Sequence, residues 1–142
     1  MWIAAAPTAL VNYLGHPNKW FRRQAALELS WRHETGVVPA LEKLARDDRN
    51  PHAFDAVCAI DLLGGLRDEL AVELLRHPDP YVRRWIVRQS AEDRDVSPML
   101  AAALTDLAGR EMQAEVRTQL LATARRLPAE TGLRIVRVMM ER

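Results

Sequence analysis

Two ten-residue stretches of the chain repeat in register: Leu14-Gly-His-Pro-Asn-Lys-Trp-Phe-Arg-Arg23 and Leu75-Arg-His-Pro-Asp-Pro-Tyr-Val-Arg-Arg84. The Leu, His, Pro and both Arg residues are identical, Asn is answered by Asp, and an aromatic residue, Trp20 or Tyr81, follows two positions later. Internal similarity of this kind is the signature of repeat architectures, in which equivalent helical or stranded units stack. The two stretches therefore predict an array of repeats. They say less about activity, because such arrays are more often recognition surfaces than catalysts.

Length and composition fit a single domain of packed helices. The chain has 142 residues, of which 49% are apolar and 6% aromatic, and it is long enough to bury a continuous core. We therefore expect residues 1–142 to form one domain. Its 20 basic and 19 acidic residues give a net charge of +1, so the global positive field of a dedicated nucleic-acid binder is absent, although a local basic face remains open.

Cysteine content and hydropathy narrow the class of protein further. Cys58 is the single cysteine, which excludes an internal disulfide and a cysteine-rich zinc or haem site, and its apolar neighbours predict a small core residue. No apolar run approaches the ~18 residues of a membrane span, and residues 1–6 lack the basic start of a signal peptide. We expect a soluble chain, cytoplasmic as given and periplasmic if it is part of an exported protein.

Proline, glycine and capping residues divide the chain into helical segments without any alternating strand pattern, which predicts an all-α fold. Asn18, Asp79 and Ser97 are expected to cap helices, and Pro80 and Pro98 suit a first helical position, where the missing N–H costs nothing. Gly64-Gly65 is expected to end the apolar helix before it. The expected elements are four helix pairs and a last, unpaired helix, at about residues 7–14 and 18–33, 37–45 and 52–63, 68–75 and 80–90, 98–109 and 112–127, and 131–141.

The second helix of each expected pair carries apolar residues at helical spacing, which predicts a stripe that faces the neighbouring pair. The stripe consists of Phe21, Ala25 and Leu29; Val57 and Ile60; Val82 and Ile86; and Val116, Leu120 and Thr123 or Ala124. Each buried Leu or Ile contributes roughly 1.5–3 kcal/mol, so stacking of the pairs would supply most of the stability. The last helix has the apolar content of an internal one, and we expect that the chain continues or that this end packs on a partner.

The segments Pro17-Asn-Lys-Trp-Phe-Arg-Arg23, Pro78-Asp-Pro-Tyr-Val-Arg-Arg84 and Glu115-Val-Arg117 resemble the starts of second helices in HEAT repeats. The resemblance covers about residues 7–127 and implies a right-handed α-solenoid of stacked antiparallel helix pairs. The second unit departs from it, with His52-Ala-Phe-Asp55 where the others place an apolar residue and two Arg. The sequence therefore does not predict an unbroken row of arginines through all the repeats. The period of about 30 residues is shorter than the ~40–47 usual for HEAT repeats and closer to short bacterial variants.

A finer resemblance concerns the order of the motifs. His-Pro-Asn-x-Trp-x-Arg, then Val-Pro-Ala-Leu, then His-Pro-Asp-Pro-x-Val-Arg-Arg is similar to the HEAT region of large planctomycete-type proteins, which join a membrane-bound dehydrogenase-like propeller to a haem-binding cytochrome domain. This similarity implies that the chain is a fragment of a larger protein. The chain has no Cys-x-x-Cys-His, so the haem site of such a parent would lie elsewhere, and we expect no cofactor here.

Arginine and aromatic residues of the second helices, most of them near the helix starts, are the candidate partner-binding residues. Interface hot spots favour Trp, Tyr and Arg, and the guanidinium group binds carboxylates and phosphates through two parallel hydrogen bonds. The candidates are Trp20, Arg22, Arg23, Tyr81, Arg83, Arg84, Arg88 and Arg117. Alternatively, these arginines form ion pairs with an acidic residue of a neighbouring repeat, such as Asp55, Asp79 or Glu115. For Trp85, core packing is favoured over contact with a partner.

Other polar residues are interpreted as structural. His16 and His77 occupy equivalent turns, and no two histidines have the i, i+4 spacing of a helical metal site, so turn or capping roles are favoured. The carboxylate pairs Asp47-Asp48 and Asp93 with Asp95 are expected to be solvated or to cap helices. Glycine-rich phosphate loops and nucleophile elbows are absent from the sequence, and we expect no catalytic residues and no metal.

These observations favour a non-catalytic HEAT-like scaffold that presents a concave surface to a protein partner or to other domains of its parent chain. The alternative is binding of the nucleic-acid phosphate backbone, as in the HEAT-like DNA glycosylases. Those enzymes carry a helical Trp followed four residues later by Asp, whereas the corresponding residues here are Ala6, Gln24, Thr35 and Gln89. This difference argues against the glycosylase activity, and a salt-dependent binding assay would test phosphate binding in general.

Overall fold

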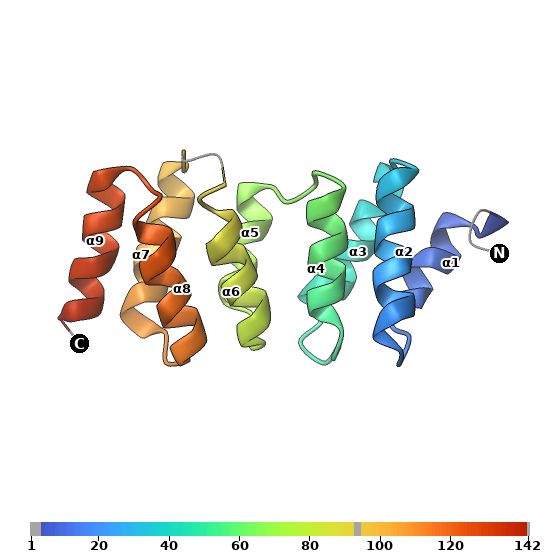
Figure 1. Ribbon diagram of the computed structural model, residues 1–142, viewed down its shortest axis with the longest axis horizontal. Helices are drawn as coiled ribbons and strands as arrows, with labels where there is room; N and C mark the ends of the chain where they lie inside the picture. Colours follow the sequence, from blue (N-terminus) through green and yellow to red (C-terminus); the bar gives the residue numbers. More distant parts are fainter. Residues whose placement is uncertain (1–3, 93–94, 142) are drawn as a thin grey trace. The chain divides into compact units, whose positions relative to one another are not determined.

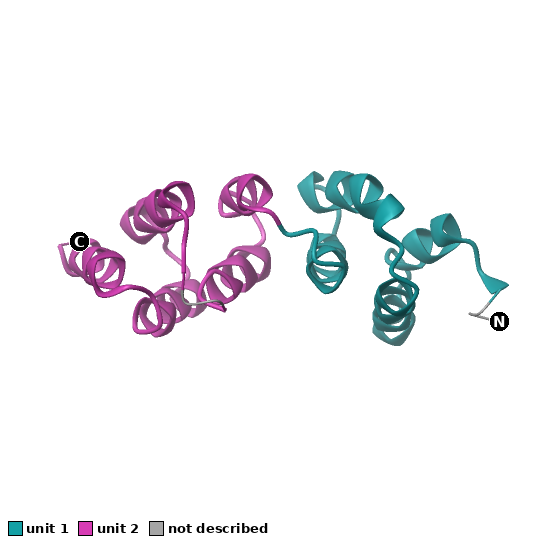
Figure 2. Cartoon of the chain, turned by 90° about the horizontal axis from the view of Figure 1, so that it is seen from above, with its two compact units in different colours: residues 1–66 teal, residues 67–142 magenta. Residues whose placement is uncertain are grey.

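The computed structural model describes residues 4–92 and 95–141, and within these ranges the chain forms nine α-helices and no strand (Figure 1). The all-α prediction is therefore confirmed. Contacts group the chain into two compact units, Met1–Leu66 and Arg67–Arg142, which Figure 2 shows in separate colours. Within each unit, helices that are adjacent in sequence pack in pairs. A single right-handed solenoid over the whole chain stays a prediction.

The first unit contains four helices and a 3-10 turn. Helix α1 packs on α2, α3 packs on α4, and α2 and α4 lie side by side. These elements are α1 (Pro7–Tyr13), α2 (Lys19–Trp31), η2 (Thr35–Val37), α3 (Val38–Arg46) and α4 (Ala53–Leu62). After α4, Gly64 adopts a φ of 73°, the left-handed conformation that glycine accepts without strain, and the helix stops there as the Gly-Gly pair predicts.

The second unit contains five helices. Helix α6 packs on α8, α5 packs on α7, and α9 contacts both α7 and α8. They are α5 (Asp68–Leu74), α6 (Pro80–Gln89), α7 (Pro98–Arg110), α8 (Ala114–Ala124) and α9 (Ala129–Met140). The helix ends differ from the expected ones by a few residues, since terminal turns are the least strongly specified part of a helix.

Short side chains cap three of these helices as the sequence predicts. The side-chain oxygens of Asn18 and Asp79 accept hydrogen bonds from backbone N–H groups in the first turns of α2 and α6. Ser97 accepts from the N–H of Leu100 at the start of α7, where Pro98 occupies the first helical position. Each cap satisfies an amide that the helix itself leaves without an acceptor.

The predicted apolar stripes form the core of each unit. Every stripe residue is buried except Phe21, which is half-buried and stacks on the ring of Tyr13 with 6.1 Å between centroids. Leu14 and Leu75, the first residues of the two repeated stretches, are also buried, so the repetition extends from sequence to packing. Within the described part of the chain, no helix is long and apolar enough to cross a membrane.

Candidate functional site

The turn that precedes α2 is held by hydrogen bonds among consecutive residues of the first repeated stretch. Nδ1 of His16 accepts from the backbone N–H of Asn18 at 2.9 Å, and Oδ1 of Asn18 accepts from the N–H of Trp20 at 2.9 Å. The imidazole ring also lies against Phe21, with 4.4 Å between centroids. The histidine therefore stabilises the turn, in the role that the sequence predicts.

The second stretch repeats this geometry before α6. Nδ1 of His77 accepts from the N–H of Asp79 at 3.0 Å, and Oδ1 of Asp79 accepts from the N–H of Tyr81 at 2.8 Å. Equivalent residues thus make equivalent bonds in both units. The side chains that follow each cap consequently start from the same backbone geometry.

The first arginine of each pair turns back toward this histidine turn. Nη1 of Arg22 donates to the carbonyls of His16 and Pro17 at 2.8 and 3.0 Å, and its Nε donates to Oδ2 of Asp55 in α4 at 3.1 Å. Both charged side chains are largely buried. Arg22 therefore links the turn before α2 to the neighbouring second helix, α4. The ion pair with Asp55 is the one that the sequence suggested as an alternative to partner binding.

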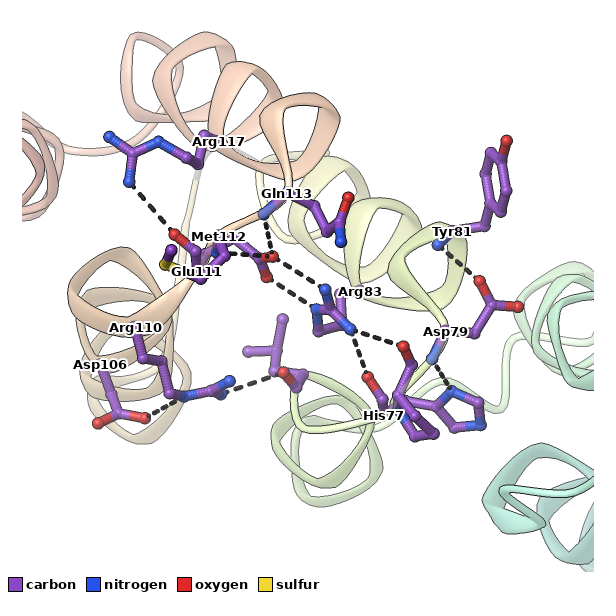
Figure 3. A network of polar contacts seen from close by, with 12 residues as sticks. His77, Asp79, Tyr81, Arg83, Asp106, Arg110, Glu111, Met112, Gln113 and Arg117 are labelled. Carbon is purple, nitrogen blue, oxygen red and sulfur yellow. Dashed lines mark hydrogen bonds and ion pairs between the residues drawn. The ribbon is translucent and has the colours of Figure 1, made fainter.

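Arg83 makes the equivalent contacts in the second unit, and its ion pair is more complete. Its Nη1 donates to the carbonyls of His77 and Pro78 at 2.7 and 3.0 Å. Its Nε and Nη2 donate to the two carboxylate oxygens of Glu111 at 2.7 and 2.9 Å. Figure 3 shows the guanidinium group between the carboxylate and the histidine turn, while the ring of Tyr81 points away from this network.

Glu111 is the charged residue at the centre of this network, and it lies just before α8. Its carboxylate also accepts from the N–H groups of Met112 and Gln113 at 3.2 and 3.0 Å. Burial alone would raise the pKa of this carboxyl, but the hydrogen bond from Arg83, the two backbone amides and the positive charge outweigh it. The pKa of Glu111 therefore lies below its ordinary value.

Sequence reasoning named Asp79 and Glu115 as acidic partners in this unit and missed Glu111. The spacing of the sequence could have pointed to Glu111, because it lies six residues before Arg117, as His77 lies six residues before Arg83. Its carboxylate accepts the N–H two positions on, which is what the histidine Nδ1 does in the two repeated stretches. Glu111 thus takes the place of the turn histidine and binds the arginine of the preceding repeat as well.

The remaining candidates near the starts of α2 and α6 face solvent. Trp20 and Tyr81 are 54% and 64% exposed, and Arg23 and Arg84 are exposed beside them. Arg88 is also exposed and lies over the ring of Trp85, 5.9 Å from its centroid. Each unit thus has its own copy of what we name the aromatic–arginine face: Trp20 and Arg23 on α2 in the first unit, and Tyr81, Arg84 and Arg88 on α6 in the second. Trp85, predicted to pack in the core, is half-buried beneath this face.

An open hollow adjoins this face on α2. Its volume is about 430 Å³, and it is lined by Lys19, Trp20, Arg23, Gln24 and Leu27. The lining thus combines two cations, an indole ring and the apolar side chain of Leu27. This combination suits a carboxylate flanked by an apolar side chain, because Arg and Trp bind such groups through charge and through ring contact.

The cysteine and the paired carboxylates noted in the sequence do not form a reactive or metal-binding site within the described residues. Burial, followed by the nearby charges of Asp55 and Asp61, raises the pKa of the Cys58 thiol to about 12, so the thiolate needed for nucleophilic attack is scarce near neutral pH. The carboxylates of Asp47 and Asp95 accept from nearby backbone N–H groups. Asp93 lies outside the described residues. Within residues 4–92 and 95–141, no three His, Cys, Asp or Glu side chains form a metal-binding group.

The protein family is not identified by similarity. No family model, curated protein or solved structure matches the chain. The resemblance to HEAT repeats therefore stays a prediction, supported at a coarser level by the all-helical fold and its paired helices.

Proposed function

We propose that the protein is a non-catalytic, HEAT-like interaction module whose second helices present the aromatic–arginine face to an acidic segment of a protein partner. The observation that supports this most is the division of labour within each arginine pair. Arg22 and Arg83 are used internally, whereas Arg23 and Arg84 face solvent beside an exposed aromatic ring. The same arrangement occurs in both units, at the same positions after the helix cap.

The chemistry of the face favours a protein partner with carboxylates next to apolar side chains. Exposed Trp and Tyr bury large apolar area on binding, and arginine contributes charge with a fixed donor geometry. Phosphate-backbone binding would rely on a broad field of positive charge, whereas the chain as a whole has a net charge of only +1. The partner can be a separate protein or another domain of a longer parent.

A solenoid arrangement of the helix pairs would bring equivalent faces of successive second helices into one row. In such arrays each pair contacts its neighbours, and equivalent surface positions line up along the stack. The side-by-side packing of α2 with α4 and of α6 with α8 supports this arrangement inside each unit.

Site-specific photo-cross-linking tests the proposal. A photoreactive phenylalanine is placed at Trp20, Tyr81 or, as a control on a first helix, at the exposed Met99, and cross-linked proteins are identified by mass spectrometry. We expect the probes at Trp20 and Tyr81 to cross-link the same partner protein and the probe at Met99 not to cross-link it. Equal capture at all three sites would mean that this face has no special role.

Charge reversal then measures the contribution of the arginines to binding of the captured partner. Arg23→Glu and Arg84→Glu are each expected to weaken binding about tenfold, which corresponds to ~1.4 kcal/mol and is a typical effect for an interface arginine. Arg49→Glu, at an exposed loop position, makes the same change in net charge and should leave affinity unchanged. Affinity that is equal in all three variants, or a preference for duplex DNA that falls steeply with salt, would contradict the proposal.

A further inference from the structure

The turns before the second helices α2, α4, α6 and α8 share one hydrogen-bond pattern. In each turn, the side chain two positions before the helix cap accepts from the backbone N–H of the cap residue. Nδ1 of His16, Nδ1 of His77 and Oε1 of Glu111 do so before α2, α6 and α8. Oδ1 of Asn50 does so before α4, where it accepts from the N–H of His52 at 3.0 Å. The turn before α4 is therefore equivalent to the other three.

Three of these turns also contain an arginine, at the fourth position after the cap. Nη1 of Arg22, Arg83 and Arg117 donates to the carbonyl oxygen two positions before the cap, at 2.8, 2.7 and 3.2 Å. Figure 3 shows this contact for Arg83 and Arg117. In α4 the same position is Ala56, which is buried and whose methyl group cannot donate a hydrogen bond. The turn before α4 thus has the common geometry without a guanidinium group of its own.

A hollow of about 460 Å³ lies at this turn, and we name it the α1–α3 hollow. Its lining includes Asn50, His52 and Ala56, together with residues from the C-terminal part of α1 and from one side of α3. All of its lining residues belong to the first unit. Its volume lies within the range of about 300–1,000 Å³ that is typical of small-molecule sites. The turn that lacks an arginine therefore has space beside it for a group from outside the chain.

The walls of the α1–α3 hollow are largely apolar. Val11, Leu14 and Leu44 line it, and a long cationic side chain packs its aliphatic stem on surface of this kind. The lining contains one lysine, Lys43, and one carboxylate, Asp47, one turn apart at the end of α3. Lys43 is exposed, and its flexible stem lets the ammonium group extend into water.

Two acceptors near the turn suit the donors of a guanidinium group. The carboxylate of Asp47 accepts from the N–H of Arg49 at 3.0 Å and forms no ion pair within residues 4–92 and 95–141. The carbonyl oxygen of Asn50 accepts from the N–H of Ala53 at 3.2 Å and has a second lone pair for another donor. A guanidinium group has five N–H donors in one plane, so it can reach two acceptors at once, whereas an ammonium group is a compact point charge.

We propose that the α1–α3 hollow binds an alkylguanidinium group, which comes from a free guanidino compound or from an arginine side chain of a partner. The group donates to the carbonyl oxygen of Asn50, as the chain's own arginines donate to the equivalent carbonyls, and to the carboxylate of Asp47. Its aliphatic stem lies on the apolar wall. This site shares no residue with the aromatic–arginine face, and it does not rest on the proposed function.

Titration of the full chain with n-propylguanidinium chloride, followed by NMR, tests the proposal. At millimolar concentrations we expect saturable shifts of the Ala56 methyl group and of the Asn50 backbone N–H. Binding of n-propylurea, which has the same shape without the charge, and of n-butylammonium should be at least about tenfold weaker. Equal binding of n-propylurea, larger shifts with butyrate, or no saturable shift with n-propylguanidinium would overturn the proposal.

A blocked peptide, acetyl-Ala-Arg-Ala-amide, distinguishes the two sources of the group. It presents the same guanidinium on a peptide backbone. Tighter binding of the peptide than of n-propylguanidinium supports an arginine of a partner protein. Tighter binding of n-propylguanidinium supports a free guanidino compound.

Variants of the full chain identify the groups that bind. Asp47→Asn keeps the oxygen that accepts from Arg49 and should weaken n-propylguanidinium binding about tenfold. Asp48→Asn, the same change at an exposed neighbour outside the lining, should leave binding unchanged. Lys43→Gln should strengthen binding, because it removes a positive charge from the lining, and circular dichroism confirms that each variant folds. Equal effects of the two aspartate variants, or weaker binding to Lys43→Gln, would overturn the proposal.

Discussion

Replacement of Glu111 by alanine is expected to lower the free energy of unfolding by about 3–4 kcal/mol at pH 7. The substitution leaves the largely buried guanidinium of Arg83 without its carboxylate, and breaking one partner of a buried ion pair costs about this much. It also removes the acceptor for two backbone N–H groups before α8. Urea unfolding followed by circular dichroism measures the loss.

Glu115→Ala is the matched control, because Glu115 is an exposed acid in the first turn of α8. Its effect should stay within about 0.5 kcal/mol, as for most surface substitutions. If the two alanine variants unfold at the same urea concentration, the Arg83–Glu111 pair contributes nothing beyond surface charge.

The Arg83–Glu111 ion pair also makes the free energy of unfolding depend on pH. The pKa of Glu111 is lower in the folded chain than its ordinary value of 4.5, so the folded state favours the carboxylate. This contribution is fully present above about pH 4.5 and is lost as the pH falls through the folded pKa. The unfolding free energy of the wild type should therefore fall more steeply in acid than that of Glu111→Ala, and parallel acid profiles would contradict this account.

Replacement of Gly132 by alanine is expected to destabilise the protein by about 2 kcal/mol, although alanine is the better helix former. Gly132 lies in α9, and a Cβ there would overlap the backbone carbonyl of Ala124 at the end of α8. Backbone cannot move aside as a flexible side chain can, so α9 must shift away from α8. Thermal or urea unfolding measures the effect.

Gly109→Ala, in the same unit, is expected to stabilise the protein, in contrast to Gly132→Ala. Gly109 lies near the end of α7, and its added Cβ would meet only Val138 Cγ1 at 3.5 Å, an ordinary contact. The higher helix propensity of alanine then determines the outcome, and the free energy of unfolding of the variant should rise by roughly 0.5–1 kcal/mol. Stabilisation by both alanine substitutions would mean that α8 and α9 do not approach each other as closely as described.

Much of the local structure could be predicted because it depends on contacts between residues close in sequence. Asn18, Asp79 and Ser97 cap their helices through N–H groups two or three residues away, and the Gly64-Gly65 pair ends α4. The apolar stripes follow from helical spacing alone. These features need no knowledge of how the pairs pack.

The arginine partners depend on packing between repeats and were harder to predict. Asp55 was among the expected partners of the arginines, but the position of Glu111 relative to Arg83 depends on the length of α7, which lies between them. Likewise, helical spacing alone did not decide whether Trp20 is buried, because its burial depends on which side of α2 the other helices cover. Whether the exposed candidates bind a partner stays a prediction.

Within each arginine pair, the first arginine makes internal contacts (Arg22 and Arg83), whereas the second faces solvent (Arg23 and Arg84). A direct test compares urea unfolding of Arg83→Gln and Arg84→Gln, which differ only in which of two adjacent arginines is lost. Arg83→Gln should lower the unfolding free energy by at least about 2 kcal/mol, and Arg84→Gln should change it by less than about 0.5 kcal/mol. Equal losses, or a larger loss for Arg84→Gln, would contradict this division of roles.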